Sequence, residues 1–322
     1  MDALDVSTVA VVGAGTMGAG IAGEFARAGC DVRLVDLRSD LLQRGMEMLT
    51  AAQQALVEAD LVSEPEAAAA LSRVSTLTSL EGACESVDLL IEAVPEDLAL
   101  KQSMFERFDR CCPKEALLAS NTSGLSITAI ARATARPERV AGVHFWNPPH
   151  VIPLVEITQG EETAEPTTAL LLQVCRQIGK RPILVRHDVP GFVGNRLQFA
   201  VLREALHILS QGIASAEDID AAMSCGPGLR YGLLGPLRTA DLGGLDVFAA
   251  ISKYLFAELC ADPHPPDVLT DLVQQGNLGA KTGSGFYAYG AEDLKRILAQ
   301  RDRVLLEFVK ILRREEGRHT DG

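Results

Sequence analysis

Two residues with complementary acid–base chemistry flank a proline-rich turn. His144 ends the apolar run Val140–Phe145, and Glu156 belongs to the next β-rich run. Pro148 and Pro149 exclude a helix between them, so hairpin-like geometry can bring the two side chains together. Imidazole titrates near neutrality and suits a general base, and a carboxylate on its far nitrogen would fix the tautomer and stabilise the imidazolium. The pair predicts a base that takes a proton from a hydroxyl group.

Two further polar side chains could hold the reacting oxygen. Ser123 follows the short apolar run Leu117–Ala119, and Asn195 lies near the start of a long amphipathic segment. Each residue has a plain structural reading, since a serine is common in turns and an amide is common on helix surfaces. The functional interpretation depends on their occurring together with His144 and Glu156.

The elements that must position this chemistry begin with a glycine-rich turn. The buried-strand run Val9–Val12 leads into Gly13, Gly15 and Gly18, and the helical segment Met17–Ala28 follows. Gly13 permits a tight turn, Gly15 lets backbone approach a pyrophosphate, and Gly18 lets the helix pack close to the strand. The strand, turn and helix together predict a dinucleotide-binding site.

The residues around that turn indicate which dinucleotide binds. The helix N-terminus at Thr16 and Met17 offers free N–H groups and a partial positive charge to the phosphates. Asp36 ends the second β-rich run, where it can accept hydrogen bonds from ribose hydroxyls and would repel a 2′-phosphate. We therefore predict NAD rather than NADP, with Arg38 as a solvated loop residue. FAD uses the same turn, which by itself does not separate nicotinamide from flavin.

Composition bounds the class of protein. The 322 residues are 47% hydrophobic and 23% charged, enough for two domains with substantial cores. The net charge of −13 argues against non-specific nucleic-acid binding, and no apolar run is long enough to span a bilayer. The seven cysteines are scattered, without a Cys-x-x-Cys pair. We expect a soluble, cytoplasmic protein with reduced thiols, no disulfide framework and no metal site.

The first part of the chain alternates β-rich and helical runs, which predicts an α/β fold with a Rossmann-type doubly wound sheet over residues 1–187. We expect a sheet with more strands than the usual six. The expected strands are Val9–Val12, Val32–Val35, Val74–Leu77, Leu89–Ala93, Leu117–Ala119, Val140–Phe145, Leu154–Ile157 and Ile183–Val185. The stretch Arg44–Ser72 is expected to form a helical pair, longer than a plain crossover requires.

The pattern changes near Asp188, and residues 188–290 predict an all-helical domain. Its helices are expected at Phe192–Gln211, Ala216–Met223, Thr239–Leu259 and Pro266–Gln275. Residues 291–322 form a C-terminal helical extension with an apolar stripe between Glu292 and Leu312. That stripe could pack on a partner subunit or on the chain's own domain.

Seven segments in order resemble the L-3-hydroxyacyl-CoA dehydrogenase family, from Val9 to about Tyr289. They are Gly13–Gly18, Glu92–Glu96, Ser120–Ser123, His144–Glu156, Pro190–Arg196, Gly235–Pro236 and Lys281–Tyr287. The resemblance implies an NAD domain followed by a helical domain through which the protein forms a homodimer.

The same resemblance implies roles for individual residues. His144 would be the general base with Glu156 as its partner, and Ser123 and Asn195 would contact the reacting end of the substrate. The remaining matched positions would line the cofactor: Glu96, Lys101 and Asn147 at its ribose and nicotinamide, and Lys281 reaching back toward it.

The chain departs from the family's acyl-CoA members in the stretch Arg44–Ser72, where those members carry lysine facing the phosphates of CoA. Residues 45–72 contain five carboxylates and neither lysine nor arginine. An acidic arm would repel a highly anionic CoA. The loop Asn147–Pro153, called the Pro-Pro loop below, is similar to that of carnitine and gulonate dehydrogenases. The long helix after Tyr289 is similar to that of a bacterial pyridine-carboxylate dehydrogenase. We expect a small 3-hydroxy-acid-like substrate, its carboxylate anchored by Arg196, Arg230 or Arg238.

Three alternatives stay open. Basic groups elsewhere could still hold CoA, which would make the chain a short-chain L-3-hydroxyacyl-CoA dehydrogenase. A non-catalytic NAD-binding sensor or structural protein would keep Gly13, Gly15 and Asp36 without needing a proton relay. A 3-hydroxyisobutyrate-type dehydrogenase would use a lysine as its acid and base, but no lysine lies beside Asn195.

Overall fold

The chain divides into two compact units. The computed structural model describes residues 6–320, and the side chains of residues 6–312. One unit runs to Arg196 and includes the C-terminal stretch that begins at Asp302, whereas the other is Leu197–Arg301.

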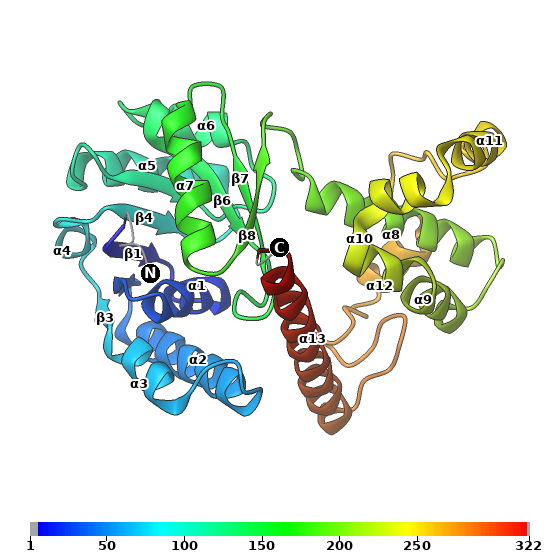
Figure 1. Ribbon diagram of the computed structural model, residues 1–322, viewed down its shortest axis with the longest axis horizontal. Coiled ribbons are helices and arrows are strands. Elements are labelled where there is room, and N and C mark those ends of the chain that lie inside the picture. The colour runs from blue at the N-terminus through cyan, green and yellow to red at the C-terminus, as the bar shows by residue number, and fades with distance from the viewer. Residues whose placement is uncertain (1–5, 321–322) are drawn as a thin grey trace. The chain divides into compact units, whose positions relative to one another are not determined.

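The first unit is built on an eight-stranded sheet (Figure 1). Its strands are β1 (Thr8–Val12), β2 (Asp31–Val35), β3 (Val74–Leu77), β4 (Leu89–Glu92), β5 (Leu117–Ser120), β6 (Val140–Phe145), β7 (Leu154–Thr158) and β8 (Arg181–Val185), in the order β3-β2-β1-β4-β5-β6-β7-β8. The first six strands in that order are parallel, β7 is antiparallel to β6, and β8 is parallel to β7. All eight expected strands are present, and the Rossmann-type prediction is confirmed.

Helices cover both faces of this sheet. The first face holds α1 (Thr16–Arg27), α2 (Ser39–Glu58), α3 (Glu64–Ser72) and α7 (Glu165–Gln177), and the second holds α4 (Leu80–Cys84), α5 (Leu98–Cys111) and α6 (Ile127–Ala131). A 3₁₀ turn, η1 (Pro137–Arg139), precedes β6. Alternate residues of β1 enter different cores, with Val9 and Val11 in one and Ala10 and Val12 in the other. This burial on both faces explains why the strands read as continuous apolar runs.

The chain becomes helical after β8. The helices are α8 (Gly194–Ser210), α9 (Ala216–Cys225), α10 (Pro227–Gly243), α11 (Leu245–Leu255), α12 (Asp267–Gln274) and α13 (Ala291–Thr320). The expected single helix Thr239–Leu259 is wrong, because Gly244 takes a φ of 92° and separates α10 from α11. No helix within the described residues is long and apolar enough to cross a membrane.

The expectation that every thiol is reduced is also wrong for one pair. Cys84 ends α4 and Cys111 ends α5, and these neighbouring helices bring the two cysteines into a disulfide with a Cα–Cα distance of 5.7 Å. The sequence separation of 27 residues gave no motif that would indicate the pairing. Cys112 adds a third sulfur within 4.8 Å. With two of the three sulfurs bonded to each other, the cluster offers a single thiol.

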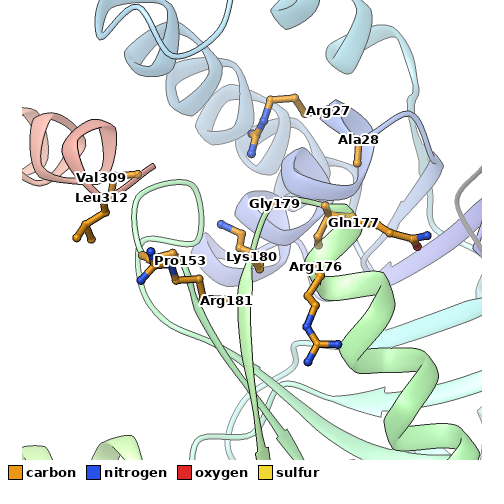
Figure 2. Close-up of a pocket in the computed structure, with 11 residues that line it drawn as sticks. Arg27, Ala28, Pro153, Arg176, Gln177, Gly179, Lys180, Arg181, Val309 and Leu312 are labelled. Atoms are coloured by element: carbon orange, nitrogen blue, oxygen red, sulfur yellow. The ribbon is translucent and has the colours of Figure 1, made fainter. Parts of the chain in front are cut away.

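The C-terminal helix belongs partly to each unit, because α13 begins in the second unit and continues beyond Asp302 in the first. Its buried residues Leu306 and Val309 lie in the first unit, and Leu306 packs with Leu56 of α2 and with Val151. Leu305 and Leu306 therefore pack on the chain's own first unit, whereas Ile297, Leu298, Val304 and Ile311 of the expected stripe are exposed. Figure 2 shows Val309 and Leu312 beside a basic cavity of about 580 Å³ whose lining includes none of the predicted site residues.

Candidate active site

The turn after β1 is packed tightly on one side and open on the other. Gly13 has a φ of 106°, and a Cβ on Gly18 would lie 1.7 Å from the Gly13 carbonyl oxygen. A Cβ on Gly15, in contrast, would meet nothing within 4 Å. Gly15 is also the N-cap of α1 and gives no side-chain cap, which leaves the amides at Thr16 and Met17 available to a ligand. This open cradle at a helix N-terminus fits a pyrophosphate.

Asp36 lies beside this turn, directly after β2. Its Oδ2 accepts a hydrogen bond from the Ala14 amide at 2.8 Å, and its Oδ1 accepts one from Leu37 at 2.7 Å. The carboxylate is therefore held in place, with lone pairs left for ribose hydroxyls. Arg38 turns instead to Asp40 and donates to both of its oxygens, at 2.8 and 2.5 Å. The arrangement fits NAD and leaves Arg38 engaged elsewhere.

A buried ion pair fixes the next loop at the same edge of the sheet. Glu92 ends β4, and its carboxylate accepts hydrogen bonds from the ammonium of Lys101 at 2.6 Å and the hydroxyl of Ser120 at 2.6 Å. Lys101 also donates to the Val94 carbonyl at 3.2 Å and lies 3.4 Å from Glu96. The three ammonium protons of Lys101 thus have three protein partners.

Glu96 connects this loop to the segment that follows β5. One carboxylate oxygen accepts hydrogen bonds from the Thr122 hydroxyl at 2.5 Å and the Ser123 amide at 2.9 Å. The Glu96 side chain is 45% exposed, unlike that of Lys101. Of these two predicted cofactor residues, Glu96 is the one with surface left to offer a ligand.

The structure brings His144 and Glu156 together as the hairpin argument requires. The two residues stand directly opposite each other in the antiparallel β6–β7 pair, and His144 Nδ1 lies 2.8 Å from Glu156 Oε2. Both side chains are buried. Since an ionised carboxylate only accepts, Nδ1 carries a proton, and in a neutral imidazole Nε2 then holds the lone pair. Nε2 makes no hydrogen bond to the described residues.

Glu156 is held by the turn that begins α8 as well as by His144. Its Oε1 accepts hydrogen bonds from the amides of Val193 at 3.0 Å and Gly194 at 2.8 Å. The indole of Trp146 donates to Oε2 at 3.1 Å. Burial on its own would raise the pKa of Glu156, but these hydrogen bonds and the one from His144 lower the pKa below its usual value.

The remaining predicted residues fall into two groups. Asn195 donates to the carbonyl oxygen of Ser123 at 2.8 Å, so both lie in the network that contains Glu96 and Glu156. Asn147 is exposed and precedes a cis peptide to Pro148. Lys281 is an exposed residue of the second unit.

Several side chains of this network were not predicted, among them Glu92, Asn121 and Trp146. Glu92 binds Lys101, Asn121 accepts a hydrogen bond from the Phe145 amide at 2.8 Å, and Trp146 binds Glu156. Each is polar or carries a donor at the end of a strand that leads to the site, and that position is the signal that could have indicated them.

An open dinucleotide turn and a buried imidazole–carboxylate pair at one sheet edge define the class as an NAD-dependent dehydrogenase.

Comparison with known proteins gives the family. Residues 8–189 match the 3-hydroxyacyl-CoA dehydrogenase NAD-binding domain, and residues 191–289 match the C-terminal domain of the same family. The chain belongs to the 3-hydroxyacyl-CoA dehydrogenase family and is an NAD-dependent enzyme that acts on a hydroxyl group.

Two kinds of relative stand out. The chain is 34% identical to 5-formyl-3-hydroxy-2-methylpyridine 4-carboxylate 5-dehydrogenase of Mesorhizobium japonicum, covering 97% of this chain and 99% of that protein. A crystal structure described as this enzyme, an NAD⁺-dependent dismutase, has a TM-score of 0.90 over 96% of this chain and 99% of that one. A probable 3-hydroxybutyryl-CoA dehydrogenase of Bacillus subtilis is 38% identical over 89% of this chain and 98% of that protein. A crystal structure of (S)-3-hydroxybutyryl-CoA dehydrogenase from Ralstonia eutropha is 37% identical, with a TM-score of 0.74. The match covers 89% of this chain and 100% of that one.

Proposed function

We propose that the enzyme oxidises an alcohol, or the related hydrated aldehyde, of a small carboxylate-bearing substrate. The observation that carries the proposal is the His144–Glu156 pair, which holds one imidazole nitrogen and leaves the other free to take a proton. NAD, when bound, supplies the hydride acceptor for such an oxidation.

In this proposal His144 Nε2 removes the hydroxyl proton while Glu156 stabilises the imidazolium that forms. Ser123 and Asn195 hold the reacting oxygen from the loop after β5 and from the start of α8. Asp36 and the open turn at Gly15 bind the ribose and pyrophosphate ends of the cofactor. Glu96, Asn147 and Lys281 complete the cofactor site, and Lys101 acts by holding Glu96 in place.

The charge of the helical arm supports a small substrate over an acyl-CoA. From Met46 to Ser72, α2 and α3 carry only acidic charges, whereas CoA brings several phosphates. Unlike charges attract and like charges repel over a Debye length of roughly 8 Å at physiological salt, so a phosphate-bearing chain is disfavoured along this arm.

The C-terminal helix gives independent support. Leu306 of α13 packs against Leu56 of the arm and Val151 of the Pro-Pro loop, and the family's C-terminal domain ends at residue 289. The match to the pyridine-carboxylate dehydrogenase spans 313 residues and so extends into α13, whereas the match to the Bacillus subtilis enzyme spans 287. The extension goes with the small-substrate relative.

The second candidate is 3-hydroxybutyryl-CoA dehydrogenase activity. It is favoured by the 38% identity to the Bacillus subtilis protein, which is higher than the identity to the pyridine-carboxylate enzyme. Either substrate would use the same proton relay, so the two candidates differ in what the arm and α13 admit.

We further propose a cytoplasmic homodimer formed through the helical domain. Large apolar side chains of that domain are exposed, among them Leu237 at 85%, Leu242 at 72% and Phe256 at 70%. Patches of this kind mark protein–protein interfaces. Analytical ultracentrifugation of the purified protein would give twice the 34.4 kDa chain mass if the proposal is right, and the mass of one chain if it is wrong.

The experiment that tests the substrate follows NADH absorbance with acetoacetyl-CoA beside free acids: carnitine, gulonate and pyridine-carboxylate alcohols and aldehydes. Turnover of a free acid with no turnover of acetoacetyl-CoA supports the proposal, and fast turnover of acetoacetyl-CoA overturns it. Leu306→Ala should raise the KM of the preferred acid several-fold, because Leu306 supports the Pro-Pro loop. Val304→Ala, on an exposed position of the same helix, is the matched control.

A further inference from the structure

The carboxylate of Glu156 is shared between two ring N–H donors. His144 Nδ1 lies 2.8 Å and Trp146 Nε1 lies 3.1 Å from the same oxygen, Oε2. The other oxygen, Oε1, accepts from the amides of Val193 and Gly194. A carboxylate has about four lone-pair sites, so these four hydrogen bonds fill them.

The indole is fixed in this position by its surroundings. A Cβ on Gly194 would lie 2.3 Å from Trp146 Cζ2, which means that the backbone at the start of α8 lies directly against the ring. The ring centroids of Trp146 and His144 are 5.6 Å apart. The indole is thus held between His144 and the first turn of α8, and its N–H has one direction in which to donate.

We propose that Trp146 is a positioning residue. It shares the carboxylate oxygen Oε2 of Glu156 with His144 and so sets how tightly the imidazole holds its proton. The inference rests on the proposed function, in which His144 is the base. A donor to Oε2 draws negative charge away from the contact with His144. The indole thereby weakens the stabilisation that Glu156 gives to the imidazolium.

The groups around the imidazole make this a test of one interaction. Glu156 on β7 is the charged group that contacts His144 among the described residues. From the segment that leads into α8, His144 faces the ring of Phe192, at a centroid distance of 5.9 Å, and the Val193 and Gly194 amides are already bound to Glu156. None of these three groups titrates, so a change in protonation on altering Trp146 reports on the shared carboxylate.

The test measures protonation of His144 directly, without a substrate. Histidine-labelled, ligand-free protein is titrated by NMR, and the signal of His144 is assigned with His144→Gln. In Trp146→Phe, which keeps a ring and removes the donor, the titration midpoint should rise by about 0.5 pH unit, roughly a threefold tighter hold on the proton. A midpoint equal to that of the unaltered protein would overturn the inference.

A second variant removes the donor without changing the shape of the ring. The sequence contains a single tryptophan, so growth on β-(3-benzothienyl)alanine replaces Trp146 alone and puts sulfur where the N–H was. The same rise in midpoint is expected there, even if Trp146→Phe does not fold. An unchanged midpoint in this isosteric variant shows that the indole serves packing only and sinks the proposal. Turnover by His144→Gln is a separate measurement: activity at the original rate would remove His144 as the base whatever Trp146 does.

Discussion

Two buried acid–base pairs stand at the same edge of the sheet, and they are built for different purposes. Glu92 at the end of β4 pairs with Lys101 of α5, and His144 near the end of β6 pairs with Glu156 of β7. In both pairs a carboxylate accepts hydrogen bonds from neighbouring backbone or side chains. The difference lies in the nitrogen-bearing partner: Lys101 has a protein partner for each of its ammonium protons, whereas His144 Nε2 makes no hydrogen bond to the residues that the structure describes.

Burial alone therefore does not tell whether an ion pair serves stability or activity. A saturated pair such as Lys101–Glu92 fixes a loop, and its removal should cost stability. A pair with one unfilled position should instead cost activity when it is altered, because that position is where a substrate proton can be received. The predictions below test this distinction, from the largest expected effect to the smallest.

His144→Ala should lower kcat by about 10²–10⁴-fold, the usual contribution of a positioned general base. The KM for NAD should stay unchanged, because His144 is not part of the turn at Gly15. Stopped-flow or steady-state NADH absorbance with the substrate found in the panel gives the measurement. A kcat within tenfold of the original enzyme would contradict the assignment of the base.

Lys101→Met should lower the free energy of unfolding by about 3–5 kcal/mol, because it leaves the carboxylate of Glu92 buried without its cation. Urea denaturation followed by circular dichroism measures the loss. Lys114→Met, at an exposed position, is the matched control and should change stability little. If both variants were equally stable, the view of Lys101 as a structural cation would be wrong.

A third buried pair, Glu24–Lys180, predicts a pH dependence. Burial on its own would raise the pKa of Glu24, but the charges of Lys180 and Arg27 lower it to about 2 from 4.5. The stabilisation, about 3 kcal/mol by linkage, is therefore present above pH 4.5 and lost as the pH falls toward 2. Glu24→Gln should be less stable than the original protein at pH 7, and the difference should shrink through that range in urea titrations. A difference independent of pH would contradict the predicted titration.

Gly15→Ala should weaken NADH binding by about tenfold, or roughly 1.4 kcal/mol, while the melting temperature stays the same. The new methyl group meets no protein atom within 4 Å and would occupy the space assigned to the pyrophosphate. Fluorescence titration with NADH measures the affinity. Gly18→Ala is the contrasting variant, since its methyl group would clash with Gly13 and lower stability. Unchanged affinity in Gly15→Ala would move the phosphate site elsewhere.

The sheet could be predicted from the sequence because its central strands β1, β4, β5 and β6 are buried on both faces and read as apolar runs. The apolar pattern of Thr239–Leu259 continues across Gly243 and Gly244 and predicts a single helix, whereas this pair of glycines, itself a helix-stop signal, ends α10. The approach of His144 and Glu156 could be predicted because a proline-containing loop joins two consecutive β-rich runs, which favours an antiparallel pair.

Contacts that depend on how helices and loops pack could not be predicted from the sequence. Cys84 and Cys111 meet because α4 and α5 end side by side, and neither spacing nor count indicates that. Trp146 lies in the sequence between His144 and Asn147, two predicted site residues, yet its hydrogen bond to Glu156 depends on the angle at which the indole meets Oε2. Side-chain partners of this kind follow from tertiary packing rather than from local pattern.

The placement of Leu306 and Val309 also bears on how the protein is made. A chain emerges from the ribosome N-terminus first, and domains usually fold in that order. Here Val151, in the loop that follows His144, packs on Leu306, which comes after the whole second unit in the sequence. The core of the first unit is therefore completed only after the second unit has been synthesised, and Val151 acquires its last contacts at that stage.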